Sequence, residues 1–222
     1  MKLKFQGFLG LAGPSGAGKT TAARMLEELG CAVIDCDLLA REIVQPGSPV
    51  LAQLAVRFGE DILCKGDILD RKVLAERAFE NEKTRQDLNF ITHPAITQLV
   101  LARAKALQKN RAIVLDAAAL LESELVNLCA HILVITAPEE LRLQRILNRD
   151  GMTEAEAWKR IKAQRNMTFG EPRCTVIDND GGEEALWHAV EEALRMVAGD
   201  TGGAAGGAAG GAAGGVPSAP GG

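Results

Sequence analysis

The sequence predicts an α/β fold built on a five-stranded, mostly parallel sheet, and three observations lead to this fold class. Five short apolar runs rich in β-branched residues are typical of strands buried on both faces of a parallel sheet. Segments of helical character separate these runs, which favours strands joined by helical crossovers. A glycine-rich loop follows the first run directly. The predicted strands are residues 8–12, 32–35, 112–116, 131–136 and 175–178.

The loop after the first strand has the phosphate-loop pattern G-x-x-x-x-G-K-[S/T] and opens a predicted helix over 19–29. Its glycines let the backbone curl so that N–H groups point at phosphates. Lys19 is expected to reach the β- and γ-phosphates of ATP, and the Thr20 hydroxyl to ligate Mg²⁺. A chance glycine-rich turn is the alternative, but the flanking strand and helix favour a phosphate site. The expected ATP-binding residues here are Gly13, Ser15, Gly16, Ala17, Gly18, Lys19, Thr20 and Thr21.

Two carboxylates, Asp35 and Asp37, stand at the carboxyl end of the second predicted strand. Ligands of open α/β sheets bind at this edge. One carboxylate there can accept or orient the proton of an acceptor hydroxyl, while its neighbour helps hold the water shell of a metal. Arg41 is placed to bind an anionic group of a substrate. The alternative is structural, because Asp37 would also serve as the N-cap of a helix.

More than seventy residues separate the second and third predicted strands, far more than a simple crossover needs. Much of 48–109 has helical character, including an amphipathic stretch over 66–88, and His93-Pro94 is expected to break and restart the helix. We therefore expect a helical insertion, at about 40–110, that holds the second substrate. A lone histidine such as His93 is more often a packing or capping residue than a catalytic one.

The third predicted strand ends in Asp116, which fits the strand whose carboxylate approaches Mg²⁺, usually through water. The pattern is weak, because any buried strand that ends in Asp matches it. The metal ligands expected from the sequence are thus Thr20 with either Asp35 or Asp116.

Arginines gather in the predicted helix 138–149, where Arg142, Arg145 and Arg149 share one face. A capping box at 153–156 opens a second basic helix over 153–166. Together they predict an arginine-rich lid, at about 145–170, that neutralises charge on a transferring phosphoryl group. A solvated basic face is the alternative. Asn179, after the last strand, is placed to contact a base edge, unless it belongs to a plain Asn-Asp-Gly turn.

Composition excludes several classes of protein and suggests a location. A net charge of −4 argues against broad binding to nucleic acid or a membrane surface. No apolar run is long enough to span a membrane, and the basic start leads into a strand instead of a signal peptide. Five cysteines without C-x-x-C or zinc spacing are typical of reduced thiols, so we expect a cytoplasmic protein. A phosphate-loop domain is expected over 1–198, with a disordered Gly/Ala-rich tail at 199–222.

Four functions fit a phosphate loop: a small-molecule kinase, a GTPase switch, an ATPase module that drives a partner, and a nucleotide-binding protein without turnover. The chain lacks the N-K-x-D segment with which switches recognise guanine. An ATPase module usually has a longer chain. A small-molecule kinase therefore fits best, and other phosphate-loop kinases, including those for nucleoside monophosphates, remain the alternative.

Seven further segments, taken in order with the phosphate loop, resemble the dephospho-coenzyme A kinase family from residue 9 to about 197. The most specific is "VIDCDLLAREIVQPGSP", a strand ending D-x-D before an A-R-E-like run. The others are "GDILDRKVLAERAF", His93-Pro94, "LLE" at 120–122, "RILNRDG" at 145–151, "RIKAQ" at 160–164 and "VIDNDG" at 176–181.

The resemblance implies a P-loop kinase fold of the nucleoside monophosphate kinase type. It also implies the Mg²⁺-dependent transfer of the γ-phosphate of ATP to the ribose 3′-hydroxyl of dephospho-coenzyme A, the last step of coenzyme A biosynthesis. The enzyme would be a monomer or a small homo-oligomer. The residue roles that the resemblance implies are Asp37 as catalytic base, Lys19 and Arg145 at the phosphates with Arg149 in support, Asn179 near adenine, and Asp35, Asp37, Arg41, His93 and Asp116 around the acceptor.

The sequence departs from the family pattern in three places. Pro14-Ser15 replaces a pair such as Gly-Ile, which should leave the phosphate cradle intact. Ala118 stands where the family generally has Pro, so we expect a relaxed backbone and a looser acceptor site there. The segment 165–175 also differs, and we assign Arg173 no role.

Overall fold

The computed structural model describes residues 7–164, 173–197 and 199, and its centre is a five-stranded sheet. The strand order is β2-β5-β1-β6-β7, and each neighbouring pair is parallel. The strands are β1 (Phe8–Ala12), β2 (Ala32–Asp35), β5 (Ile113–Asp116), β6 (Cys129–Thr136) and β7 (Cys174–Asp178). All five predicted strands are therefore confirmed, with shifts of at most two residues at their starts. In the pairing of β2 with β5, Asp35 lies directly beside Asp116.

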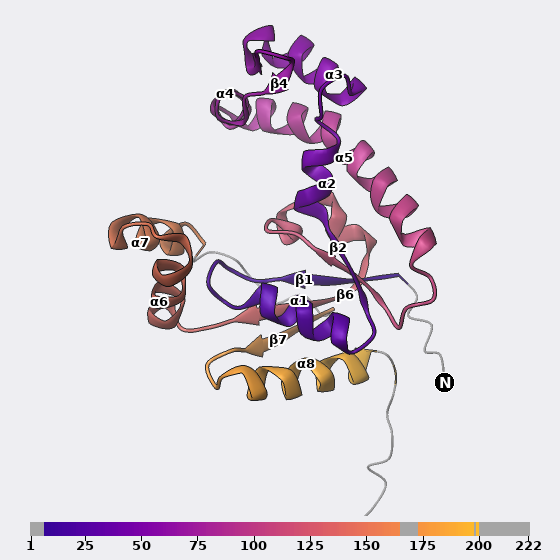
Figure 1. The fold of residues 1–222 in the computed structure, drawn as a ribbon, viewed down its shortest axis with the longest axis vertical. Coiled ribbons are helices and arrows are strands. Elements are labelled where there is room, and N and C mark those ends of the chain that lie inside the picture. Colours follow the sequence, from indigo (N-terminus) through magenta and orange to yellow (C-terminus); the bar gives the residue numbers. More distant parts are fainter. Residues whose placement is uncertain (1–6, 165–172, 198, 200–222) are drawn as a thin grey trace, which may run out of the picture.

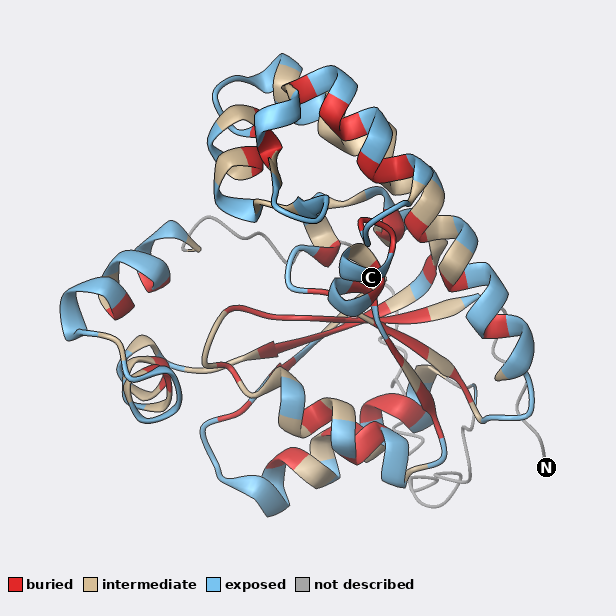
Figure 2. Ribbon diagram, turned by 45° about the horizontal axis from the view of Figure 1, so that its top comes forward, coloured by how far each residue is buried: buried red, intermediate tan, exposed pale blue. Residues whose placement is uncertain are grey.

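Helices cover both faces of the sheet, so the strands are buried on both sides (Figures 1 and 2). On one face lie α1 (Lys19–Glu28) and α8 (Glu183–Val197). Their apolar side chains pack against alternate strand residues such as Leu9, Leu11 and Leu133. The other alternate residues, such as Ile132 and Val134, face a second core. Helix α8 was not among the elements predicted from the sequence.

The second core belongs largely to the long connection between β2 and β5, which rises above the sheet in Figure 1. Its helices are α2 (Cys36–Glu42), α3 (Pro49–Phe58), α4 (Arg71–Ala78) and α5 (Glu82–Ala106). Between α3 and α4 lie the short helix η1 (Glu60–Ile62) and a two-stranded hairpin, β3 (Leu63–Cys64) and β4 (Ile68–Leu69). After β5 come η2 (Leu120–Glu122) and η3 (Glu124–Leu128).

Two local predictions for this connection are wrong. Residues 66–88 do not form one helix: 66–70 hold the hairpin turn and β4, and the chain turns again before Asn81 caps α5. His93-Pro94 does not interrupt the helix either, since Pro94 lies inside α5. The ring of Pro94 is exposed, while Ile96 and Val100 on the other side of α5 are buried in the core. Tertiary packing therefore outweighs the loss of one helical hydrogen bond.

The predicted pair of basic helices is present as α6 (Glu139–Asp150) and α7 (Glu154–Ala163). Gly151, at φ 63°, turns the chain between them, and Thr153 and Glu156 form the expected capping box. The pair has a small core of its own, made by Ile146, Ala157 and Ile161, and stands at one side of the sheet (Figure 1).

Parts of the sequence-based description lie outside the residues that the structure describes. These are the end of the predicted second lid helix, the divergent segment 165–172 and all of the tail except Gly199. Among the described residues no helix is long and apolar enough to cross a membrane. All five cysteines lie within the described residues and none forms a disulfide; Cys64 is exposed.

Candidate active site

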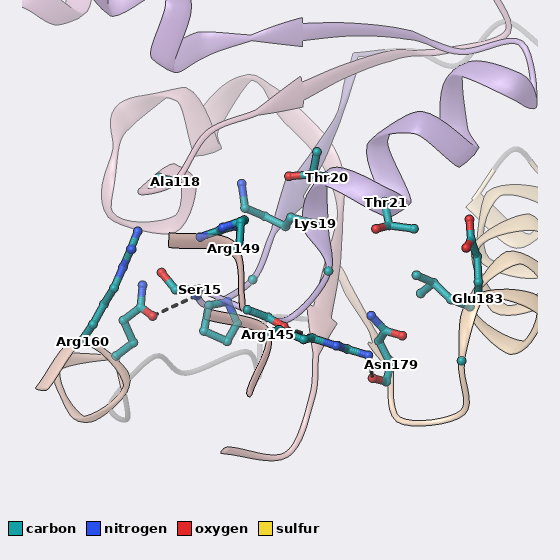
Figure 3. A pocket seen from close by; sticks show the side chains of 17 residues that line it. Ser15, Lys19, Thr20, Thr21, Ala118, Arg145, Arg149, Arg160, Asn179 and Glu183 are labelled. Carbon is teal, nitrogen blue, oxygen red and sulfur yellow. Dashed lines mark hydrogen bonds between the residues drawn. The ribbon is translucent and has the colours of Figure 1, made fainter. Parts of the chain in front are cut away.

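A cavity of about 550 Å³ opens at the carboxyl ends of the strands, between the phosphate loop and the α6–α7 pair (Figure 3). Its walls carry polar side chains from four separate parts of the chain. They include Ser15, Lys19, Thr20 and Thr21 from the loop and α1, Arg145 and Arg149 from α6, Arg160 and Gln164 from α7, and Asn179 after β7. The fold thus brings together most of the ATP-binding residues predicted from the sequence.

The phosphate loop adopts a conformation that requires glycine. Gly13 has φ +146°, and a Cβ there would lie 2.3 Å from the carbonyl oxygen of Ile135. Gly18 has φ +104°, and its Cβ would lie 2.2 Å from Nδ2 of Asn179. The first N–H groups of α1 have no partners within the helix, and the helix dipole makes that end positive. The loop therefore presents a site for phosphate at the start of α1.

Lys19 pairs with a carboxylate at the sheet edge beside the loop. Nζ of Lys19 donates to Oδ1 of Asp116 at 2.6 Å, with both side chains about one-fifth exposed. Asp35 lies beside Asp116 in the register, and its Oδ1 accepts from the N–H of Leu38 at 2.9 Å. Asp35, and not Asp37, is therefore the N-cap of α2, so the structural alternative for Asp37 is wrong.

Asp37 lies in the first turn of α2, exposed, and Oδ2 accepts a hydrogen bond from the backbone N–H of Ala118 at 3.2 Å. The preceding residue, Cys36, is buried. Burial raises the pKa of Cys36 to about 12, and the charges of Asp37, Cys129, Asp116 and Asp35 act in the same direction. Cys36 thus stays a neutral packing residue beside a concentration of negative charge.

The arginines of α6 have different tasks, although they share one face. Arg142 is only 5% exposed, and its Nε donates to the carbonyl of Ser15 at 2.9 Å. Burial lowers its pKa. Arg145 lines the cavity and donates to the carbonyl of Asn179 at 3.1 Å, with longer contacts of 3.4 Å to Gly16 and Ala17.

Arg149 and Arg160 line the cavity from α6 and α7, and Asp150 pairs with both. The Oδ1 atom of Asp150 accepts from Nε of Arg149 at 2.5 Å, and Oδ2 accepts from Nη1 of Arg160 at 3.0 Å. The hydrogen bond with Asp150 raises the pKa of Arg149. One carboxylate therefore joins two cations at the mouth of the cavity.

Asn179 is 5% exposed, and its Nδ2 donates to the carbonyl of Ala17 at 2.7 Å. It lines the cavity, but its amide is used to hold the phosphate loop, so its contact with a base stays a prediction. Arg160 and Gln164 were not among the predicted site residues. Both lie in the segment "RIKAQ", whose resemblance to the family was the one available signal.

None of the five predicted acceptor residues lines this cavity: Asp35, Asp37 and Asp116 lie at or just after the ends of β2 and β5, and Arg41 and His93 lie farther along the long connection. Arg41 is exposed on α2. His93 has 13% of its side chain exposed, and its Nδ1 lies 3.5 Å from Oε2 of Glu124 with no hydrogen-bond partner among the described residues. Both belong to the long connection, so their roles stay predictions.

The family model and the curated relatives agree on one family. A family model described as dephospho-CoA kinase matches residues 7–184. A dephospho-CoA kinase of Syntrophotalea carbinolica is 41% identical over 87% of this chain and 94% of its own. One from Shouchella clausii is 38% identical over 86% of this chain and 98% of its own. A solved dephospho-CoA kinase from Campylobacter jejuni superposes with a TM-score of 0.61 at 25% identity, covering 87% of this chain and 98% of that one.

Proposed function

Since the chain belongs to the dephospho-CoA kinase family, an ATP-dependent kinase family that acts on an alcohol group in the last step of coenzyme A biosynthesis, we propose that Asp37 is its catalytic base. The observation that supports this proposal is that Asp37 accepts a hydrogen bond from Ala118, which lines the cavity with the phosphate loop, while Lys19 donates to Asp116, two residues before Ala118. In this proposal ATP lies with its triphosphate on the loop and the ribose 3′-hydroxyl of dephospho-CoA lies at Asp37.

Phosphoryl transfer of this kind depends mostly on positioning and on neutralisation of charge. The hydroxyl of the acceptor loses its proton to Asp37 as its oxygen bonds to the γ-phosphorus, and the bond to the leaving ADP oxygen breaks. A carboxylate of ordinary basicity suffices when the proton leaves late. Lys19 and Arg145 stabilise the charge on the phosphate oxygens, with Arg149 and Arg160 in support.

The donor set beside Lys19 fits Mg²⁺. The exposed hydroxyl of Thr20 and the carboxylates of Asp116 and Asp35 supply the oxygen ligands that this cation prefers. We propose that Thr20 would hold it, with Asp35 or Asp116 in support through water. When bound, Mg²⁺ neutralises charge on the β- and γ-phosphates.

We propose that the acceptor lies next to Asp37, with Arg41 and His93 as candidate contacts. The connection joins the sheet through α2, which carries Asp37 and Arg41 on adjacent turns. We propose that this helical insertion, at about 40–110, selects the acceptor, and that 145–170 forms the lid. A cytoplasmic location and a monomeric or small homo-oligomeric state stay predictions.

The test is ADP release from Mg-ATP, measured alone and with dephospho-CoA, adenosine, shikimate or a nucleoside monophosphate. We expect strong stimulation by dephospho-CoA and little by the others. The product is then analysed for the position of the new phosphate. Stimulation by another acceptor, or ADP release that needs none, would contradict the assignment of the insertion.

A further inference from the structure

The peptide groups on both sides of Ser15 are held by the lid helices. The N–H of Ser15 donates to Oε1 of Gln164 at 2.9 Å, which the dashed line at Ser15 marks in Figure 3. The carbonyl of Ser15 accepts from Nε of Arg142 at 2.9 Å. Nη2 of Arg142 donates to the same oxygen of Gln164 at 3.2 Å. Two side chains from α6 and the end of α7 thus clamp one residue of the phosphate loop.

Because a peptide group is planar, a hydrogen bond that fixes its N–H or its carbonyl also fixes the orientation of the whole group. The carbonyl of Pro14 and the N–H of Ser15 belong to one plane, and that carbonyl accepts from the N–H of Ala17 at 3.1 Å. The carbonyl of Ser15 and the N–H of Gly16 belong to the next plane. Because the peptide is trans, the pull of Arg142 on the carbonyl directs the N–H of Gly16 to the opposite side. Gln164 and Arg142 therefore fix the direction of loop N–H groups.

Gln164 also ties the end of α7 to the body of the molecule. Helix α7 packs against α6 through Ile161 and Ala157, and its Arg160 pairs with Asp150 of α6. Gln164 ends α7 as its C-cap, and its side chain reaches the loop between β1 and α1. The contact spans 149 residues of sequence, so it joins two distant parts of the chain.

We propose that Gln164 is a positioning residue for ATP: it fixes the Pro14–Ser15 peptide and holds the end of α7 against the phosphate loop. Arg142 completes the clamp from a buried position. The inference rests on the proposed use of the loop for ATP, but it does not depend on which acceptor is used. Loss of the Gln164 oxygen removes two hydrogen bonds, one of them from a cation, and weakens ATP binding about tenfold.

The experiment compares Gln164→Met with the same change at Gln144→Met. Methionine keeps the length of the side chain and removes the strong acceptor, and Gln144 is exposed on α6. Titration of each full-length protein with a non-hydrolysable ATP analogue gives the affinity without an acceptor. The ¹H–¹⁵N signal and the exchange rate of the Ser15 amide report the clamp directly. Because neither readout uses dephospho-CoA, a failure of the proposed acceptor would leave this test intact.

We expect Gln164→Met to weaken binding of the analogue about tenfold, to shift the Ser15 signal and to speed its exchange, while Gln144→Met does none of these. In steady-state turnover, Gln164→Met should raise KM for ATP with little change in KM for dephospho-CoA. In a Ser15→Ala background, which keeps the N–H of residue 15, Gln164→Met should weaken binding of the analogue by the same factor. Unchanged affinity would overturn the proposal whether or not the amide signal moves. An unchanged Ser15 amide, or equal losses in both variants, would overturn it as well.

Discussion

The backbone N–H of Ala118 donates a hydrogen bond to Oδ2 of Asp37, across 81 residues of sequence, at 3.2 Å. The family generally has proline at this place, and a proline has no N–H to donate. The departure that we expected to loosen the acceptor site thus also adds a contact to the proposed base. A charged acceptor makes this bond stronger than one between neutral groups.

Replacement of Asp37 by Ala should leave ATP binding nearly unchanged and lower kcat by at least about a hundredfold, the usual scale for a positioned base. The loop and Lys19, which hold ATP in the proposal, do not depend on this side chain. Analogue titration and steady-state turnover check the two parts of the prediction. A variant that retains most of its turnover would exclude Asp37 as the base.

The contact from Ala118 is tested by Ala118→Pro, which removes the N–H, with Ala118→Gly as the matched control that keeps it. The proline variant should lose about fivefold to tenfold in kcat, because one hydrogen bond that orients the base is gone. The glycine variant should stay within about twofold of the parent. Equal turnover in the two variants would show that this bond has no effect on the base.

The sequence predicted the sheet well, because each strand is a short apolar run whose partners are fixed by the parallel crossover pattern. Lys19 and Thr20, which a local motif defines, line the cavity, while their roles stay predictions. The sequence did not predict the contacts of Arg142 and Gln164 with Ser15, because these contacts join segments more than a hundred residues apart. The same holds for the continuous helix at Pro94, where tertiary packing outweighs a local breaking signal.

Pro94 offers a stability test of that conclusion. Pro94→Ala restores an N–H that can donate within α5 and removes a ring from an exposed position, so no cavity forms. Proline inside a helix costs about 3 kcal/mol, and part of this is offset because proline also restricts the unfolded chain. We expect the free energy of unfolding to rise by about 1–2 kcal/mol in urea titrations. Gln98→Ala, exposed one turn later, should change it by less than about 0.5 kcal/mol.

Alanine substitutions at Gly18 and Gly47 distinguish two costs to stability: the strain of a positive φ, and the steric clash of a new Cβ with a neighbouring atom. Both have positive φ, +104° and +82°, but a Cβ at Gly18 would meet Nδ2 of Asn179, whereas one at Gly47 would meet nothing within 4 Å. Gly47→Ala should cost about 1 kcal/mol of stability. Gly18→Ala should cost at least about 2 kcal/mol and should also weaken ATP binding, since Asn179 holds the loop carbonyl of Ala17. Equal costs in urea unfolding would contradict the collision.

The contribution of Asp150, which pairs with Arg149 of α6 and Arg160 of α7, to the free energy of unfolding should depend on pH. The hydrogen bond with Arg149 holds the pKa of Asp150 below its ordinary value, and the charges of Arg149 and Arg160 act in the same direction. A carboxyl whose pKa is lower in the folded state stabilises that state above the unfolded pKa of about 4. This stabilisation is lost as the pH falls through the pKa that Asp150 has in the folded state. Asp150→Asn cannot titrate, so it loses the contribution at every pH.

The measurement is the difference in free energy of unfolding between the parent and Asp150→Asn, taken from urea titrations between pH 7 and pH 3. We expect a constant difference above about pH 5 and a shrinking one below about pH 4, because the parent then loses the charge that the variant lacks. Other carboxyls with lowered pKa, such as Asp61 and Asp70, titrate in both proteins and cancel. High salt should reduce the difference near neutral pH, since these side chains are partly exposed. A difference that stays the same from pH 7 to pH 3 would show that the carboxylate does not hold the two arginines.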